Sequence, residues 1–236
     1  MKLTLVHLYP ELMNLYGDRG NVLCLVQRAK WRGIDLEVKY VSIKDELPKK
    51  YDLLFMGGGQ DRGQELVAND LFRKGHDIKT AIESDVPALV ICGGYQLFGH
   101  YFMTSEGKRL QGIGVFNAST SATQTRLIGN VLLKSDMFGE LIGFENHSGQ
   151  TVISASSDPL GRVVRGHGNN ESSKMEGIVY KNAIGTYLHG SFLPKNPVVA
   201  DFLLAAAIRR HRPDYSLKPL DDTLSKLATE QAKKRP

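Results

Sequence analysis

The chain has 236 residues, a hydrophobic content of 42% and a formal net charge of +5, which suit one large globular domain or two small ones. Its two cysteines exclude a disulfide framework, and the first apolar run is too short for a signal peptide or a membrane span, so we expect a cytoplasmic protein. The positive charge is scattered in small clusters without interleaved aromatic residues, which argues against a nucleic-acid-binding protein.

The first hundred residues alternate between predicted strands and helices. Apolar runs predict strands over residues 3–7, 36–41, 51–56 and 88–91. Helical spacing of apolar residues predicts helices over residues 20–32, 64–84 and 95–103, the second of them with an interruption at Gly75. Such alternation predicts a mostly parallel sheet that helices cover on both faces.

Beyond Gly107 the pattern changes to short strand candidates separated by glycine and polar turns. These candidates cover residues 112–116, 126–133, 143–145, 151–153, 161–164, 177–180 and 183–188. They predict an antiparallel extension of the sheet, followed by an amphipathic helix over residues 197–211. We therefore expect one domain over residues 1–211 and a polar tail over residues 212–236, whose helix begins at Asp221 or Asp222 as its N-cap.

The turn at Cys92 is the first candidate for chemistry. Cys92 directly follows the apolar run of residues 88–91, and Gly93 and Gly94 come next. A strand-to-helix turn of this kind holds a nucleophile at a helix N-terminus, where the helix dipole favours the thiolate. A buried core cysteine is the alternative interpretation, because free cysteines are often buried. Cys24 lies within a predicted helix, and we expect it to be structural.

A second glycine-rich turn, residues 57–59, follows the strand that ends at Met56. It lacks the Lys-Ser/Thr ending of a phosphate-binding loop and the spacing of a dinucleotide fingerprint. The carboxyl ends of parallel strands share one edge of the sheet, so N–H groups from this turn and from the Cys92 turn can converge on a developing oxyanion.

The chain offers seven histidines as candidates for a base. His189 ends an apolar strand at a glycine turn, His147 is its rival, and His7 also ends a strand, where a satisfied polar residue is the simpler interpretation. A nucleophile, a second N–H loop and a distant histidine are the minimal set for acyl transfer. No histidine pair has the spacing of zinc ligands, so we expect no metal site.

Three motifs occur in order along the chain: Cys92-Gly-Gly-Tyr-Gln96, Gly143-Phe-Glu-Asn-His-Ser-Gly149 and Gly185-Thr-Tyr-Leu-His-Gly190. Together with Leu15-Tyr-Gly-Asp-Arg-Gly-Asn21 and Gly57-Gly-Gly-Gln-Asp61, they resemble the class I (cysteine-type) glutamine amidotransferases of the cobyric-acid-synthase-like (CobB/CobQ-like) branch, over about residues 3–210. Within this branch, the chain is similar to the glutaminase subunits of lipid II isoglutaminyl synthase. The resemblance implies a three-layer, flavodoxin-like α/β fold.

The resemblance also implies roles for individual residues. Cys92 would be the nucleophile and His189 the base, and the N–H groups of Gly58 and Gly93 would form the oxyanion hole. His147 would then organise a loop near the cleft.

Two further residues are expected to bind the substrate by resemblance. Gln96 would lie beside glutamine, and Arg126 would bind its α-carboxylate, which a guanidinium group can hold through two hydrogen bonds. The structural alternatives are a helix residue packed on its own turn for Gln96 and a surface charge for Arg126.

One position departs from the pattern of the family. Many class I amidotransferases have a glutamate two residues after the catalytic histidine, and this chain has Ser191. A serine cannot stabilise an imidazolium as a carboxylate does. We therefore expect a Cys92–His189 dyad to which a partner subunit supplies the carboxylate, with Glu145 or another acid of this chain as the alternative.

The implied reaction is hydrolysis of L-glutamine through a cysteine thioester, with no metal or organic cofactor in this chain. Ammonia would pass to a Mur-ligase-like synthetase subunit, MurT, which would use ATP and Mg to amidate the D-glutamate α-carboxyl of lipid II to D-isoglutamine. This heterodimer would act in the cytoplasm, at the inner face of the membrane where its lipid substrate lies. The alternatives are an amidotransferase subunit for a different, cobyrinic-acid-like acceptor and a non-catalytic binding subunit with the same fold.

Overall fold

The computed structural model describes residues 1–234, which form two six-stranded sheets and the helices that cover them. The first sheet has the strand order β11-β12-β4-β3-β1-β2. Its strands are β1 (Lys2–Leu8), β2 (Asp35–Val41), β3 (Leu53–Met56), β4 (Ala88–Ile91), β11 (Ile178–Tyr180) and β12 (Ala183–Thr186). All neighbours in it pair in parallel except β11, which is antiparallel to β12. The predicted mostly parallel sheet is thereby confirmed, with β11 as an antiparallel strand at its edge.

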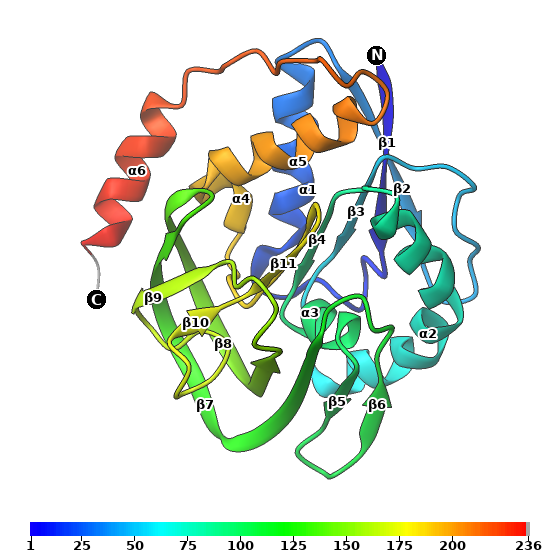
Figure 1. The fold of residues 1–236 in the computed structure, drawn as a ribbon, viewed down its shortest axis with the longest axis vertical. Coiled ribbons are helices and arrows are strands. Elements are labelled where there is room, and N and C mark those ends of the chain that lie inside the picture. The colour runs from blue at the N-terminus through cyan, green and yellow to red at the C-terminus, as the bar shows by residue number, and fades with distance from the viewer. Residues whose placement is uncertain (235–236) are drawn as a thin grey trace.

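Helices lie on both faces of this sheet (Figure 1). They include α1 (Arg19–Lys30), α2 (Asp61–Glu83), α3 (Gly93–Phe98) and α5 (Pro197–Arg209). The crossovers β1-α1-β2 and β3-α2-β4 run in opposite directions along the sheet, so the right-handed rule puts α1 and α2 on opposite faces. Every residue of β3, β4 and β12 is buried, as expected for strands with helices on both sides.

The second sheet has the order β10-β9-β7-β5-β6, with β8 paired to β7. Its strands are β5 (Tyr101–Met103), β6 (Arg109–Gln111), β7 (Ala118–Ser135), β8 (Gly139–Ile153), β9 (Gly161–Arg165) and β10 (Met175–Glu176). β7 and β8 form a long curved hairpin, drawn in green in Figure 1, whose register shifts between Ala122 and Leu127. The sequence predicts that the later strands extend the first sheet, but among the described residues only β11 and β12 do so, and β5 to β10 form a second sheet.

The segment after Cys92 differs from the prediction of one helix over residues 95–103. α3 ends at Phe98, and residues 101–103 form β5. Residues 112–116, predicted as a strand, lie across the end of α3 instead. The N–H groups of Val115 and Phe116 donate to Phe98 O, and that of Ile113 donates to Leu97 O. These bonds satisfy carbonyl groups that a helix end leaves unpaired.

Gly75 does not interrupt α2, which is continuous over Asp61–Glu83. A Cβ at this position would lie 2.7 Å from Ile113 Cγ2, so the glycine allows close packing between α2 and the segment that covers α3. The glycine in the middle of this helix is therefore explained by a tertiary contact.

The C-terminal region returns to the first half of the chain. α6 (Thr223–Lys233) lies against the short helix α4 (Phe192–Lys195) and against β8. Its N-cap residue is Asp222, whose carboxylate binds Arg28, while Asp221 Oδ1 accepts the hydrogen bond from Thr223 N. The last two residues of the expected tail, 235 and 236, lie outside the described residues. Within residues 1–234, no helix is both long enough and apolar enough to cross a bilayer.

Candidate active site

Four neighbouring strands of the first sheet bring candidate groups to one edge. β12, β4, β3 and β1 are adjacent and parallel, and the segments after them carry His189, Cys92, Gly58 and Asp18, in that order. The chain leaves β1 toward β2 and leaves β3 in the opposite direction toward β4, so the strand order reverses between β1 and β3. Such a reversal point is where open α/β sheets bind ligands.

Cys92 occupies a strained turn between β4 and α3. Its backbone has φ 48° and ψ −105°, a conformation that non-glycine residues rarely adopt and that costs about 1–3 kcal/mol. The turn is held because Cys92 N donates to Thr186 O at 2.8 Å. Cys92 lines an open cleft although it is only 7% exposed. Burial raises the pKa of the other cysteine, Cys24, to about 11, which keeps that thiol protonated.

His189 lies fully buried against Asp18. Its Nδ1 is 3.2 Å from each carboxylate oxygen of Asp18, so Nε2 is the nitrogen left for proton transfer on the Cys92 side. Burial lowers the pKa of His189, but the charge of the Cys92 thiolate and the Asp18 carboxylate outweigh burial and raise this pKa to about 10. His189 therefore remains protonated at neutral pH, with Nε2 available to donate a proton.

Gly58 lies between the two candidate catalytic residues. A Cβ on it would lie 2.6 Å from His189 Cε1 and 3.3 Å from Cys92 Cβ, so this close approach requires glycine. The Gly58 N–H donates to Asp18 Oδ2 at 2.7 Å. Because this N–H group is bonded to Asp18, it is not free for an oxyanion hole, contrary to the expectation for Gly58. Gly59 N lies 3.0 Å from the position of a Cβ on Gly93, so the two glycine turns approach each other closely here.

The expectation of a dyad without an acid of its own does not match this geometry. Asp18 takes the place expected for a partner's carboxylate, whereas Glu145 accepts hydrogen bonds from His167 N and Gly168 N, both at 2.8 Å. Ser191 Oγ donates to Gly17 O at 2.8 Å and so holds the loop that carries Asp18. Sequence reasoning missed Asp18, although its position after the first strand was an available signal.

The cleft that contains Cys92 has a volume of about 490 Å³. Arg126 lines it from β7, where the register shift lies, and is exposed. Its Nε donates to Asn146 Oδ1 at 2.6 Å. Cys92 and Arg126 thus line the same cleft, and His189 lies buried behind it against Asp18.

Gln96 does not line this cleft. It is 4% exposed, its Oε1 accepts from Gln64 Nε2 at 2.7 Å, and its Nε2 donates to Tyr187 OH at 3.1 Å. Gln64, from the first turns of α2, lines the cleft instead. Gln96 therefore holds the side chain of Gln64 in place, and Gln64, which lines the cleft, is the glutamine nearer to a bound substrate. His147 stacks on Tyr187 at 3.6 Å, and its Nδ1 is 2.8 Å from Gly149 O, which suits the expected organising role.

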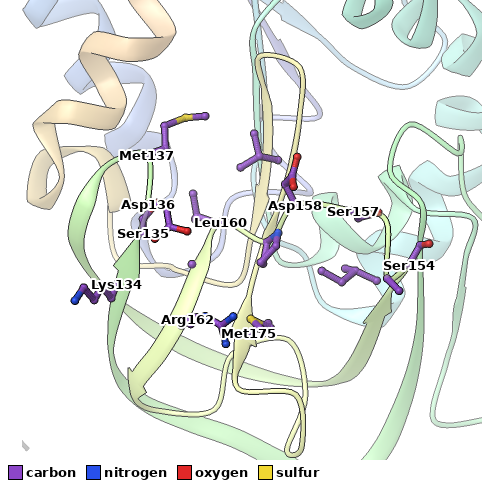
Figure 2. A pocket seen from close by; sticks show the side chains of 15 residues that line it. Lys134, Ser135, Asp136, Met137, Ser154, Ser157, Asp158, Leu160, Arg162 and Met175 are labelled. Carbon is purple, nitrogen blue, oxygen red and sulfur yellow. The ribbon is translucent and has the colours of Figure 1, made fainter.

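A second cavity, of about 530 Å³, lies away from the sheet edge (Figure 2). It is formed where β7 and β8 turn and where the segment after β8 passes, with Met137 on one side and Ser154 on the other. Of the described residues that line it, none is a cysteine or a histidine. The Cys92 cleft is therefore the candidate active site.

The chain is similar to known glutamine amidotransferases. Residues 4–197 match the CobB/CobQ-like glutamine amidotransferase domain. The chain belongs to this family, which confirms the resemblance inferred from its motifs. Among its relatives is the lipid II isoglutaminyl synthase (glutamine-hydrolyzing) subunit GatD of Staphylococcus aureus, 41% identical over 94% of this chain and 90% of that protein. The subunit of the same name from Streptococcus pneumoniae is 41% identical over 98% of this chain and 90% of that protein.

More distant relatives share parts of the chain or the fold alone. A probable cobyric acid synthase of Methanosphaera stadtmanae is 31% identical over 67% of this chain and 34% of that protein. PurLQS from Thermotoga maritima matches with a TM-score of 0.55 at 16% identity, over 90% of this chain and 100% of that chain. A glutamine amidotransferase from Thermotoga maritima matches with a TM-score of 0.52 at 18% identity, over 98% of this chain and 90% of that chain. The predicted flavodoxin-like amidotransferase fold is thereby confirmed.

Proposed function

We propose that this chain is the glutamine-hydrolysing subunit of a lipid II isoglutaminyl synthase. The observation that carries the proposal is the convergence of Cys92, His189 and Asp18 at one sheet edge, beside a cleft that Cys92 and Arg126 line. The sequence identity of 41% to two such subunits, over nearly their whole length, supports lipid II as the molecule that receives the ammonia.

The proposed reaction uses groups of this chain only. Arg126 binds the α-carboxylate of glutamine, and the Cys92 thiolate attacks the side-chain amide carbon. The tetrahedral oxyanion accepts hydrogen bonds from the N–H groups of Gly93 and Gly59, because that of Gly58 is engaged by Asp18. His189 gives its proton to the departing ammonia, and the γ-glutamyl thioester remains on Cys92.

Hydrolysis of the thioester completes the cycle. His189, now neutral, takes a proton from water, and the resulting hydroxide attacks the thioester carbonyl. Glutamate leaves, and the imidazolium–thiolate pair is restored. Asp18 stabilises the imidazolium and holds its Nδ1 edge in place throughout.

The proposed partner is a Mur-ligase-like, ATP-dependent synthetase subunit, MurT, which would receive the ammonia and amidate the D-glutamate α-carboxyl of lipid II to D-isoglutamine in the cytoplasm. Ammonia must reach its acceptor before it is lost to water, which calls for a docked synthetase. A cobyrinic-acid-like acceptor is the second candidate, because cobyric acid synthases match two thirds of the chain at 31% identity. That lower identity over a smaller share makes it the weaker candidate.

The test measures ammonia release from glutamine by the purified chain, alone and with the co-expressed synthetase, and analyses the lipid II product by mass spectrometry. Cys92→Ala should abolish both activities, and the matched variant Cys24→Ala should retain them, because Cys24 lies in α1 away from the cleft. Residual hydrolysis above about a tenth of wild type in Cys92→Ala would refute the nucleophile, since tenfold is only 1.4 kcal/mol of barrier. Amidation of a cobyrinic-acid-like acceptor with untouched lipid II would refute the proposed acceptor.

A further inference from the structure

We propose that Tyr16 is a positioning residue that links the two ends of the cleft: through Asn146 it orients Arg126, and through its ring it holds His189. The inference rests on the proposed function, because it gives Tyr16 a part in binding and hydrolysing glutamine. It concerns a residue that neither the motifs nor the reaction sequence above assigns.

The backbone of Tyr16 is held in an unfavourable conformation. Tyr16 has φ 50° and ψ 29°, in the left-handed region, inside the short turn Leu15–Gly17. Its neighbours are tied on both sides, because Leu15 N donates to Gly58 O at 3.2 Å and Ser191 Oγ donates to Gly17 O at 2.8 Å. Strain that surrounding bonds maintain in this way is commonly found where a side chain must be aimed.

Two successive hydrogen bonds connect the hydroxyl of Tyr16 to Arg126 through Asn146. Asn146 Nδ2 donates to Tyr16 OH at 2.8 Å, and Asn146 Oδ1 accepts from Arg126 Nε at 2.6 Å. Both ends of the Asn146 amide are thus used, so its orientation depends on both partners. The bond also fixes one edge of the guanidinium group, which leaves its Nη end to meet a carboxylate in the cleft.

The ring of Tyr16 covers the base. Its centroid lies 4.9 Å from that of His189 at an interplanar angle of 69°, and 6.2 Å from that of Phe144 at 64°. An edge-to-face contact of this kind restricts the imidazole while His189 Nδ1 faces Asp18. The ring of Tyr16 therefore contacts His189, and its hydroxyl contacts Asn146, which in turn binds Arg126.

A role in core packing alone does not explain this arrangement. Tyr16 is 44% exposed and lines the same cavity as Cys92, Arg126 and Asn146. A partly exposed side chain contributes little burial with which to offset a strained backbone. The strain is instead explained if the aimed side chain serves the cleft.

The hydroxyl and the ring can be tested separately. Tyr16→Phe keeps the ring but breaks the bond to Asn146, so KM for glutamine should rise about fivefold, roughly the effect of one neutral hydrogen bond, with kcat within about a factor of two. Tyr16→Leu also removes the ring from His189, so kcat should fall about tenfold in addition. Tyr180→Phe, at a partly exposed tyrosine on β11 outside the cleft, is the matched control and should match wild type.

A double-mutant cycle tests whether the hydroxyl acts through Arg126. If Tyr16 orients Arg126, the change Tyr16→Phe should have no further effect on KM once Arg126→Ala has been made. If Tyr16 acts independently, the two increases in KM should multiply.

The outcomes separate this inference from the proposed function. Wild-type protein that shows no saturable glutamine hydrolysis, alone or with its partner, overturns both. Wild-type hydrolysis together with an unchanged KM in Tyr16→Phe, or with multiplying effects in the cycle, overturns the role of Tyr16 and leaves the proposed function standing. A rise in KM that Arg126→Ala absorbs supports both.

Discussion

At the scale of single residues, Asp18 joins two parts of the candidate site. One of its oxygens accepts the Gly58 N–H at 2.7 Å, and both lie 3.2 Å from His189 Nδ1. The carboxylate therefore holds the base and the glycine turn in fixed relation. It does so from the loop that follows β1, far in the sequence from the segment after β12 that carries the histidine.

The alkaline limit of activity is expected to depend on the charges beside His189, that of Cys92 first and that of Asp18 second. His189 has its pKa raised to about 10, so the protonated form persists below that pH and is lost as pH rises through it. Asp18→Asn removes one of the charges that raise this pKa, so the alkaline limb of kcat/KM should move to lower pH. An amide oxygen can still accept from Gly58 N, which makes the variant close in shape. The pH profile of glutamine hydrolysis from pH 6 to pH 10.5 measures the shift, and superimposable profiles would contradict it.

The prediction for Arg126 concerns the binding of glutamine rather than the chemical step. Arg126→Ala removes a bidentate, charge-assisted contact, with each bond worth roughly 1.5–3 kcal/mol, so KM for glutamine should rise about tenfold or more. Arg109→Ala, on β6 outside the cleft, is the control and should keep the wild-type KM. Steady-state kinetics measure the KM of both variants, and an unchanged KM in Arg126→Ala would show that Arg126 is a surface charge that does not bind glutamine.

At the scale of elements, the first turn of α1 and the segment after β12 are packed against each other at Gly20 and Ser191. A Cβ on Gly20 would lie 2.1 Å from Ser191 Oγ and 2.8 Å from Ser191 Cβ. Ser191 itself has φ 53°, a conformation that glycine adopts without strain. Ser191, at the position where the family resemblance leads us to expect a glutamate, thus anchors the Asp18 loop in this chain.

This contact predicts that a substitution at Ser191 partly compensates for the destabilising effect of a substitution at Gly20. Gly20→Ala should lower the free energy of unfolding by about 1–3 kcal/mol, because the added methyl group overpacks the site. Adding Ser191→Gly should recover part of the loss, since it removes the clashing side chain and suits the left-handed backbone. Urea denaturation of the two variants and of Ser191→Gly alone measures the coupling. Purely additive effects would show that the two segments do not constrain each other.

At the scale of the whole molecule, the question is whether the site is complete without its partner. With Asp18 in place, we expect the isolated chain to hydrolyse glutamine, and we expect Asp18→Asn to be slower by about tenfold both alone and in the complex with the synthetase. Glu145→Gln should not reproduce this loss, because Glu145 bonds to His167 N and Gly168 N instead. Rates at saturating glutamine, with and without the partner, provide the test. Recovery of Asp18→Asn activity in the complex would show that a carboxylate of the partner serves His189.

The sequence by itself determined the features that depend on local pattern. Continuous apolar runs predicted the buried parallel strands, because a strand covered on both faces needs apolar residues at every position. The glycines after Cys92 predicted its sharp turn, and the strand-end position of His189 predicted the edge of the sheet where both now lie.

Only the tertiary structure decided which groups meet at that edge. Asp18 and His189 are 171 residues apart, and their contact follows from the strand order β12-β4-β3-β1, which no local pattern encodes. Gln64 took the place expected for Gln96 because α2 packs beside α3 and fills the cleft wall. Residues 112–116 left the strand pattern because the end of α3 offered carbonyl groups to bond. Pairings between distant segments depend on how the chain closes in space, so local periodicity cannot specify them.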